Sequence, residues 1–236
     1  MKKQTLKQEP ATDLRGAPAY SLVDGARYLK LPAPTLRSWV VGRPYPRAGG
    51  KVVRFQPLFS PASKRPIALS FWNLIEGHVL RSLRTDHGVS LKAVRAAIAY
   101  AEREFEIEAL LLSKRLSTDA GQLFLEHYGH LVSLSASGQL ALRRVFDDHL
   151  KRVVWDDWQF PVRLYPFVSR TSDTVANPIV IDPAIAFGRP ILVRAGVSTQ
   201  AIADRIDAGE TVTALAEDYG LEPSEIEQAV LYERAA

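Results

Sequence analysis

Apolar residues at helical spacing near the amino terminus predict the first of two short helices. Ser21 is a good N-cap, and Asp24 three residues later makes a weak variant of the capping box. Leu22, Ala26 and Leu29 follow at helical spacing, so one face of this helix is apolar.

A second helix is predicted after Pro32, because proline cannot donate a hydrogen bond inside a helix but is tolerated at its start. Its inward side chains are Leu36, Trp39 and Val40, and its outward side chains are Thr35, Arg37 and Ser38. A tight turn between two short helices, the second with a polar basic face, suits insertion into a DNA major groove.

The next residues predict a basic hairpin. GRPYPRAGGKVVRFQPLF has two extended, proline-bounded arms around Ala48-Gly49-Gly50. The hairpin lacks acidic residues and carries the cations Arg43, Arg47, Lys51 and Arg54.

Residues 20–58 resemble the winged helix-turn-helix of the MerR and excisionase families. The resemblance rests on Ser21, Ala26, Leu29, Leu31, Thr35, Leu36, Arg37 and Trp39. It implies that the second helix faces DNA and that the hairpin cations lie along the phosphate backbone. We expect Thr35 and Ser38 to approach base edges, and Arg37 to contact a base or a phosphate. The alternative is a small helical hairpin with a solvated basic loop.

Two more helices are predicted behind the hairpin, after a loop at residues 60–66. Ser70 caps the first helix and Ser90 caps the second. Their apolar stripes are Phe71, Leu74, Ile75, Val79 and Leu83, then Leu91, Val94, Ile98, Ala101 and Phe105. Such stripes serve a core or a dimer surface, and core packing is the commoner use.

Residues 110–168 predict a small α+β subdomain. The short apolar runs LFLEHY and LVSLS, separated by Gly129-His130 and preceded by the turn signal Asp119-Ala120-Gly121, predict an antiparallel unit. A helix is expected over residues 139–153, with one side formed by Leu142, Val145, Phe146, Leu150 and Val153. The aromatic-rich stretch VVWDDWQFPVRLYPFV then predicts extended strand.

The polar stretch SRTSDTVANP, residues 169–178, predicts a linker to a compact carboxy-terminal unit. Short strands are expected at residues 179–181 and 191–193. Three helices follow. Ser198 caps the first and Thr211 caps the second, Gly209 and Gly220 end these two, and Pro223 opens the third. The last two helices also have a helix-turn-helix pattern.

This unit resembles a bacterial antitoxin domain, long catalogued as a domain of unknown function, that occurs in VapB-like antitoxins. The similarity spans residues 178–235, with the markers Asp182-Pro183, Gly188-Arg189-Pro190, Ala208-Gly209-Glu210 and Ala216-Glu217-Asp218-Tyr219. Such antitoxins are commonly encoded beside a PIN-like ribonuclease toxin, so the resemblance implies that partner.

Charge decides which helix-turn-helix reads DNA. Residues 1–90 hold 15 Lys/Arg and 5 Asp/Glu, whereas residues 171–236 hold 4 and 11. Duplex DNA carries about one negative charge per 1.7 Å of axis, so it would repel the acidic final helix. We therefore assign DNA binding to the amino-terminal pair. The asymmetry could also serve only to keep each end in solution.

Composition and motifs argue against several classes of protein. The absence of cysteine excludes disulfides, thiolate zinc sites and cysteine nucleophiles. The sequence has no apolar run near membrane-span length and no hydrophobic signal segment, so we expect a cytoplasmic protein. Hydrolase, metalloprotease, phosphate-loop and dinucleotide motifs are missing. We expect no enzyme, cofactor or metal, and a small hydrolase using the His127 region is a distant alternative.

Together the patterns predict an α+β, mainly helical chain in five segments. They are a flexible tail (1–17), a winged helix-turn-helix DNA-binding domain with packing helices (18–109), a small α+β subdomain (110–168), a linker (169–178) and a trihelical, helix-turn-helix-like antitoxin domain (179–236).

The resulting hypothesis is an antitoxin of a type II toxin–antitoxin system. It would bind its operator DNA as a homodimer, because one short helix and one wing bury too little for tight specific binding. Acidic side chains could cover the RNA-binding cations of the toxin, and an arginine could enter its metal-binding carboxylates. The candidates are Arg189, Arg194, Asp204, Asp207, Glu210, Glu217 and Asp218. The alternative is a stand-alone MerR-like regulator with a carboxy-terminal dimerisation or sensing domain.

Overall fold

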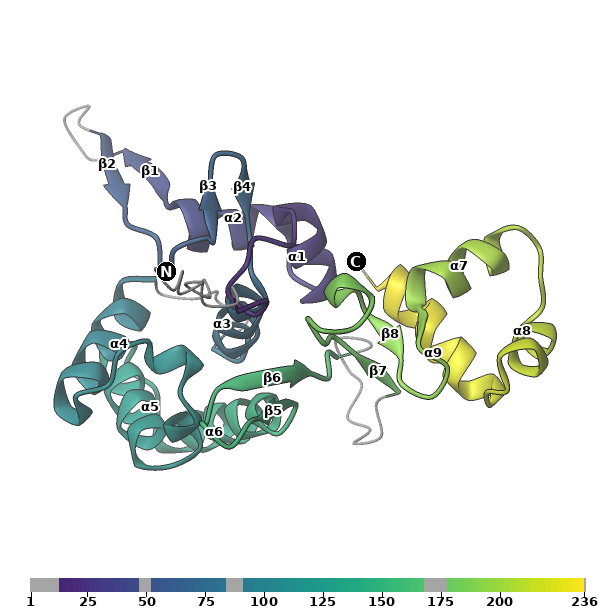
Figure 1. The fold of residues 1–236 in the computed structure, drawn as a ribbon. Helices are drawn as coiled ribbons and strands as arrows, with labels where there is room; N and C mark the ends of the chain where they lie inside the picture. Colours follow the sequence, from purple (N-terminus) through teal and green to yellow (C-terminus); the bar gives the residue numbers. More distant parts are fainter. Residues whose placement is uncertain (1–12, 47–51, 84–90, 168–177, 236) are drawn as a thin grey trace, which may run out of the picture.

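The predicted amino-terminal helix pair is present as α1 (Leu22–Tyr28) and α2 (Ala33–Val41). The computed structural model describes residues 13–46, 52–83, 91–167 and 178–235, and its fold is α+β and mainly helical (Figure 1). The Ser21 hydroxyl accepts a hydrogen bond from the Asp24 amide at 3.0 Å, which confirms the predicted cap. The predicted inward face of α2 is also confirmed, since its three apolar side chains are at most 2% exposed.

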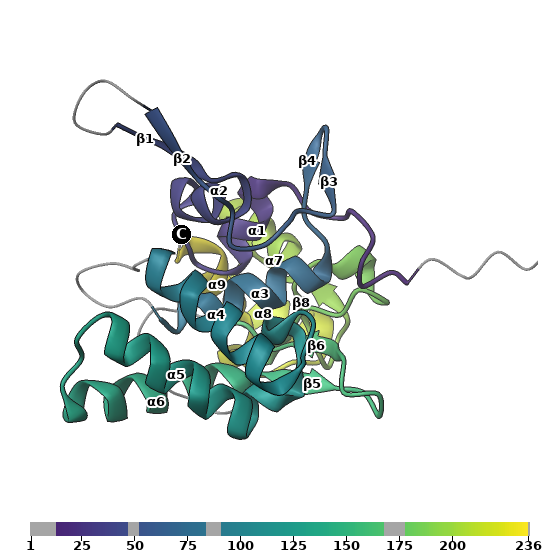
Figure 2. The ribbon, with the colours of Figure 1, turned by 90° about the vertical axis from the view of Figure 1, so that its left-hand side faces the viewer.

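A hairpin follows α2, as predicted. Its strands β1 (Arg43–Pro46) and β2 (Val52–Phe55) are antiparallel, and the hairpin projects from the body of the molecule (Figures 1 and 2). Its tip, residues 47–51, lies outside the described residues. The Leu58 amide donates to the Trp39 carbonyl at 2.7 Å, and Arg95 of α4 (Leu91–Phe105) donates to the Gln56 carbonyl. These two contacts fix the base of the hairpin.

The expected loop at residues 60–66 is in part a second hairpin. Strands β3 (Ser63–Lys64) and β4 (Ile67–Ala68) pair antiparallel and lead into α3 (Phe71–Arg81). Two residues per strand are too few to show an alternating pattern, so the sequence could not reveal them. The Ser70 capping of α3 is confirmed, and its predicted stripe is fully buried. Ser90 lies outside the described residues.

The prediction that LFLEHY and LVSLS form antiparallel strands is wrong. After two 3₁₀ turns, η1 (Leu110–Leu112) and η2 (Lys114–Ser117), this region forms the helices α5 (Asp119–Leu131) and α6 (Ala136–Leu150). Gly121, which preceded the first run as a turn signal, lies inside α5. A Cβ there would come 1.8 Å from the Leu116 carbonyl oxygen, so this glycine allows a close approach rather than a turn.

The predicted face of the following helix needs two corrections. Val145 is 45% exposed, and Val153 belongs to β5 (Val153–Trp155), because the helix ends three residues earlier. The expected extended stretch is confirmed as a hairpin of β5 with β6 (Pro161–Leu164).

Apolar side chains divide into two cores. The first runs from Tyr20 through Leu164 to Ile181, so the boundary that we predict at residue 110 falls within it. The second lies inside the carboxy-terminal unit. An antiparallel bridge between Leu164 and Ile181 connects the two regions. Most of the predicted linker, residues 169–177, lies outside the described residues. Over the described ranges, no helix is long and apolar enough to cross a membrane.

The carboxy-terminal unit is a small sheet with three helices. Strands β7 (Ile179–Val180), β8 (Ile191–Leu192) and β9 (Val197–Ser198) pair in that order, with the 3₁₀ turn η3 (Ala186–Gly188) between the first two. The helices are α7 (Thr199–Asp207), α8 (Val212–Tyr219) and α9 (Pro223–Arg234). The side-chain caps predicted at Ser198 and Thr211 are confirmed; β9 was not foreseen.

Helix α9 docks against the turn between α1 and α2, and the carboxy terminus lies beside α1 (Figure 1). Lys30 occupies that turn with a left-handed φ of 53° and is 4% exposed. Its ammonium donates to the Tyr232 carbonyl and lies 3.7 Å from the centroid of the Tyr232 ring. The Tyr232 hydroxyl donates to the Tyr28 carbonyl at 3.0 Å. Burial lowers the pKa of Lys30 to about 8.

Two histidines lie buried where α3 meets α6. His78 Nε2 is 2.8 Å from the His149 carbonyl, and the two ring centroids are 4.9 Å apart. The His149 Nδ1 atom is 2.7 Å from the Val145 carbonyl, and Phe167 packs on both rings. Burial lowers the pKa of both histidines, that of His149 to about 4.

Replacing Tyr232 by alanine should destabilise the chain by about 3–5 kcal/mol, because a fully buried ring and its hydrogen bond are lost. Urea unfolding followed by circular dichroism measures the change. The matched control is Leu231→Ala, at a neighbouring side chain that is 57% exposed. That control should stay within about 0.5 kcal/mol of wild type. Equal stability of the two variants would contradict the importance of this docking.

The His149→Gln variant should lose less stability on acidification than wild type. The folded chain keeps His149 neutral down to about pH 4, whereas the unfolded chain protonates it near 6.5. Between these values the unfolded state binds more protons, so the unfolding free energy falls as pH falls. The difference between wild type and variant should be about 2 kcal/mol between pH 7 and pH 5. Burial raises the pKa of Glu76 to about 7 and acts in the opposite direction, but equally in both proteins. Identical pH profiles would refute the prediction.

Candidate nucleic-acid and partner-binding surfaces

Helix α2 and the two amino-terminal hairpins occupy one side of the molecule. In Figure 2 β1–β2 and β3–β4 lie on either side of α2, and in both views α5 and α6 lie at the opposite side (Figures 1 and 2). A helix between two projecting hairpins is a shape that can enter a groove while the hairpins meet the flanking backbone.

The residues of α2 that we predict to face DNA differ in solvent exposure and in hydrogen bonding. Arg37 is exposed, whereas Thr35 and Ser38 are half-buried. The Ser38 hydroxyl donates to the Thr35 carbonyl at 2.7 Å. Its oxygen can therefore still accept a hydrogen bond, but its proton is engaged. Arg37 is the one charged residue of the three, and it is also the most exposed.

Two of the four predicted cations of the β1–β2 hairpin belong to the described residues. Arg43 is exposed at the start of β1 and pairs in register with Phe55. Arg54 lies in β2 opposite Pro44. Arg47 and Lys51 belong to the tip, outside the described residues.

Sequence reasoning missed two cations on the second hairpin. Lys64 ends β3 and Arg65 follows it in the turn, and both are exposed. The only signal in the sequence was a basic pair before a proline, SKRP, within an expected loop. Only the position of β3–β4 beside α2 makes them candidates for phosphate contacts.

Most of the candidate toxin-binding residues are paired within their own unit. Arg194 binds Glu225 at 2.8 Å, and Arg234 binds Asp207 at 2.7 Å. Arg205 binds both Glu210 and Asp218, each at 2.7 Å, and lowers the pKa of Glu210. These pairs engage three of the five acidic candidates, Asp207, Glu210 and Asp218.

The other candidates keep more of their charge available. Asp204 accepts a hydrogen bond from Gln200 at 2.8 Å. Arg189 and Glu217 are exposed, and neither forms an ion pair with any described residue. The structure does not gather all seven candidates into one cluster, since the ion pairs distribute them over separate contacts.

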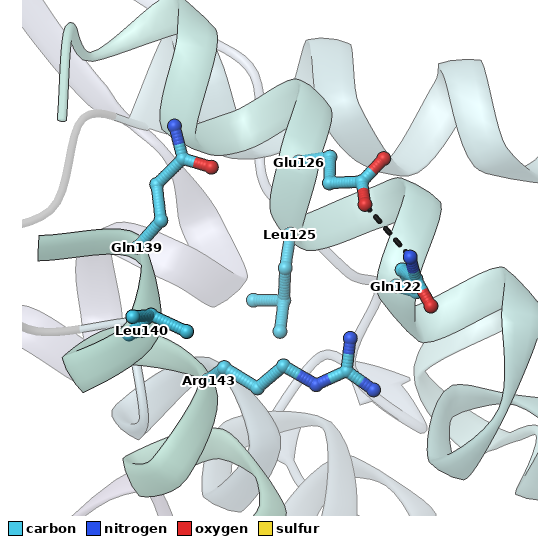
Figure 3. Close-up of a pocket in the computed structure, with 6 residues that line it drawn as sticks. All are labelled: Gln122, Leu125, Glu126, Gln139, Leu140 and Arg143. Carbon is cyan, nitrogen blue, oxygen red and sulfur yellow. Dashed lines mark hydrogen bonds between the residues drawn. The ribbon is translucent and has the colours of Figure 1, made fainter. Parts of the chain in front are cut away.

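A groove of about 350 Å³ lies between α5 and α6, with Leu125 and Leu140 among its lining residues (Figure 3). Gln122 donates to Glu126 at 2.9 Å along one wall, and Arg143 stands on the other. In the described chain no three His, Asp or Glu side chains are grouped so as to hold a metal ion. His127 stacks on Tyr100 with ring centroids 4.2 Å apart, which gives it a packing role.

Comparison with known proteins bears on both ends of the chain. Residues 18–98 match a family described as "Putative DNA-binding HTH domain", and residues 179–232 match one described as a protein of unknown function, DUF433. A Mycobacterium tuberculosis protein described as "Putative antitoxin VapB45" is 27% identical in an alignment 231 residues long, which covers 90% of this chain and 92% of that protein. The crystal structure of Rv2018 from Mycobacterium tuberculosis has the same fold. Its TM-score is 0.63 at 21% identity, covering 91% of this chain and 98% of that one. The chain thus resembles a VapB-type antitoxin along most of its length, with a helix-turn-helix DNA-binding domain at one end and a DUF433 domain at the other.

Proposed function

We propose that this chain is the antitoxin of a toxin–antitoxin pair, which represses its own operator and neutralises a PIN-like ribonuclease. The observation that carries the DNA-binding half is the side formed by α2 and two cationic hairpins. Similarity to an antitoxin over 90% of the chain supports the other half.

DNA would be bound with α2 in the major groove. Arg37 is the candidate for base contact, and the cations of both hairpins would neutralise phosphates on either side of it. One such side covers a single half-site, so two copies on a near-palindromic operator would provide the affinity.

The toxin would be bound by the carboxy-terminal unit. Because most of its acids are already paired, a broad acidic cover over the toxin is less favoured than a few unpaired groups. Arg189 is exposed and without an ion pair among the described residues, so it can reach carboxylates of a partner at little cost.

Exchanging cations on the proposed DNA-binding side should separate base contacts from phosphate contacts. Arg37→Ala should raise the Kd for the operator by about 5- to 150-fold if Arg37 reads a guanine. The double variant Lys64→Ala, Arg65→Ala should weaken binding to all sequences alike and lower the salt slope by about two. Fluorescence anisotropy with operator and scrambled duplexes at several salt concentrations measures both effects.

The control for that titration is Arg144→Ala, which removes an exposed arginine from α6 on the opposite side. It should change neither the affinity nor the salt slope. If Arg37→Ala and the double variant both behave like this control, the assignment of the DNA-binding side is wrong.

Arg189→Ala should weaken binding of the ribonuclease encoded beside this gene by about tenfold or more, because its charge is available for the partner. Calorimetry with the purified full-length chain and a catalytically inactive ribonuclease measures the Kd. Arg194→Ala is the matched control, since that arginine already binds Glu225. An equal loss in both variants would point to the stability of the unit rather than to a toxin contact.

A further inference from the structure

The turn between β7 and β8 holds an aromatic side chain in an unfavourable backbone conformation. Ala186, Phe187 and Gly188 have successive φ values of 49°, 56° and 73°. Residues with a Cβ avoid this left-handed region, and a bulky residue there is an outlier. Nevertheless the Phe187 side chain is 90% exposed, so the described chain does not bury it in compensation.

The turn is held at its first end by Asp182, which is 6% exposed. One carboxylate oxygen accepts from the Ala184 amide at 2.9 Å, and the other accepts from Arg163 of β6 at 2.7 Å. The Asp182 carbonyl accepts from the Ile185 amide at 3.0 Å. These contacts fix the start of the turn and join it to the β5–β6 hairpin.

The second end is held against the amino-terminal unit. The Gly188 amide donates to the Ile185 carbonyl at 2.8 Å, and the Arg189 amide donates to the Ala186 carbonyl at 3.1 Å. A Cβ on Gly188 would lie 2.0 Å from the Tyr20 hydroxyl oxygen. Gly188 therefore packs closely against Tyr20, so the turn cannot move toward that ring without displacing it.

Exposure alone would not single out Phe187, since isolated apolar side chains are common on protein surfaces. Trp158, in the β5–β6 turn, is 83% exposed, yet its φ is not positive. Phe187 combines exposure, strain and rigid anchoring, and its neighbours Ile185 and Arg189 are exposed as well. The result is a preformed apolar tip with a cation beside it.

We propose that residues 185–189 form the anchor of the toxin-binding surface, with Phe187 filling an apolar pocket of the toxin and Arg189 meeting carboxylates at its rim. This inference rests on the proposed function. A rigid aromatic in a pocket, surrounded by polar contacts, is the usual energetic centre of a protein interface. One phenylalanine and one isoleucine bury too little area to hold the chain on a lipid surface.

The test compares variants of the full-length chain for binding to the inactive ribonuclease encoded beside its gene. Phe187→Ala should raise the Kd by about 10- to 100-fold. Phe187→Trp should bind within about threefold of wild type, because it keeps a large ring. Trp158→Ala is the matched control for loss of an exposed aromatic and should bind like wild type.

A fourth variant separates loss of contact from loss of fold. Phe187→Gly removes both the ring and the strain, so it should raise the Tm by about 2–4 °C while binding the toxin as weakly as Phe187→Ala. Operator binding should be unchanged in every variant, because residues 185–189 lie outside the DNA-binding side.

The outcomes distinguish the two proposals. If wild type binds the ribonuclease and Phe187→Ala binds equally well, the anchor is refuted while the antitoxin function stands. If wild type does not bind, both fail. If Phe187→Ala leaves toxin affinity unchanged but converts a dimer to a monomer in light scattering, the tip is an interface between two copies and the proposal is overturned.

Discussion

The burial of the Lys30 ammonium under Tyr232 is the contact on which the arrangement of the two ends depends. Lys30 sits in the turn of the helix-turn-helix with a left-handed φ of 53°, a conformation that costs about 1–2 kcal/mol for a residue with a Cβ. Its side chain is directed at α9, where a carbonyl and an aromatic face receive the charge. The turn that orients α2, the helix proposed to bind DNA, is thus also the place where the last helix of the chain docks.

Several further contacts near Lys30 join α7 and α9 to α1. Arg27 of α1 donates to Gln200 at 2.6 Å and lies 3.7 Å from Glu233. Thr199 at the start of α7 donates to Glu233, so both α7 and α9 meet α1. A partner that displaced α9 would expose a buried lysine and leave the Tyr28 carbonyl without the Tyr232 hydroxyl. Partner binding at the carboxy-terminal unit would then be energetically coupled to DNA binding by α2.

Charge is segregated in space as well as along the chain. The basic excess of residues 1–90 includes the cations of α2 and its flanking hairpins, opposite the α5–α6 pair. Within residues 171–236, Arg194, Arg205 and Arg234 form ion pairs with four of the eleven acids, so those four carboxylates are already engaged. A count of charges therefore agrees with the family match in placing a DNA-binding domain at the amino-terminal end, but it does not show which acids of the carboxy-terminal unit are already paired. Exposed charged groups without an ion pair among the described residues, such as Arg189 and Glu217, remain available for contacts with a partner.

The sequence by itself determined the elements whose signals are local. Caps such as Ser21, Ser70 and Thr211 and the apolar stripe of α3 depend on neighbours within a few residues, so they were predictable. Tertiary structure alone decided the rest. Gly121 looked like a turn signal because the sequence cannot show the Leu116 carbonyl packed against it. The two-residue strands β3, β4 and β9 exist through pairing rather than pattern. The seat of α9 on Lys30, and the strain at Phe187 between Asp182 and Tyr20, join residues far apart in the chain, and no local periodicity encodes such contacts.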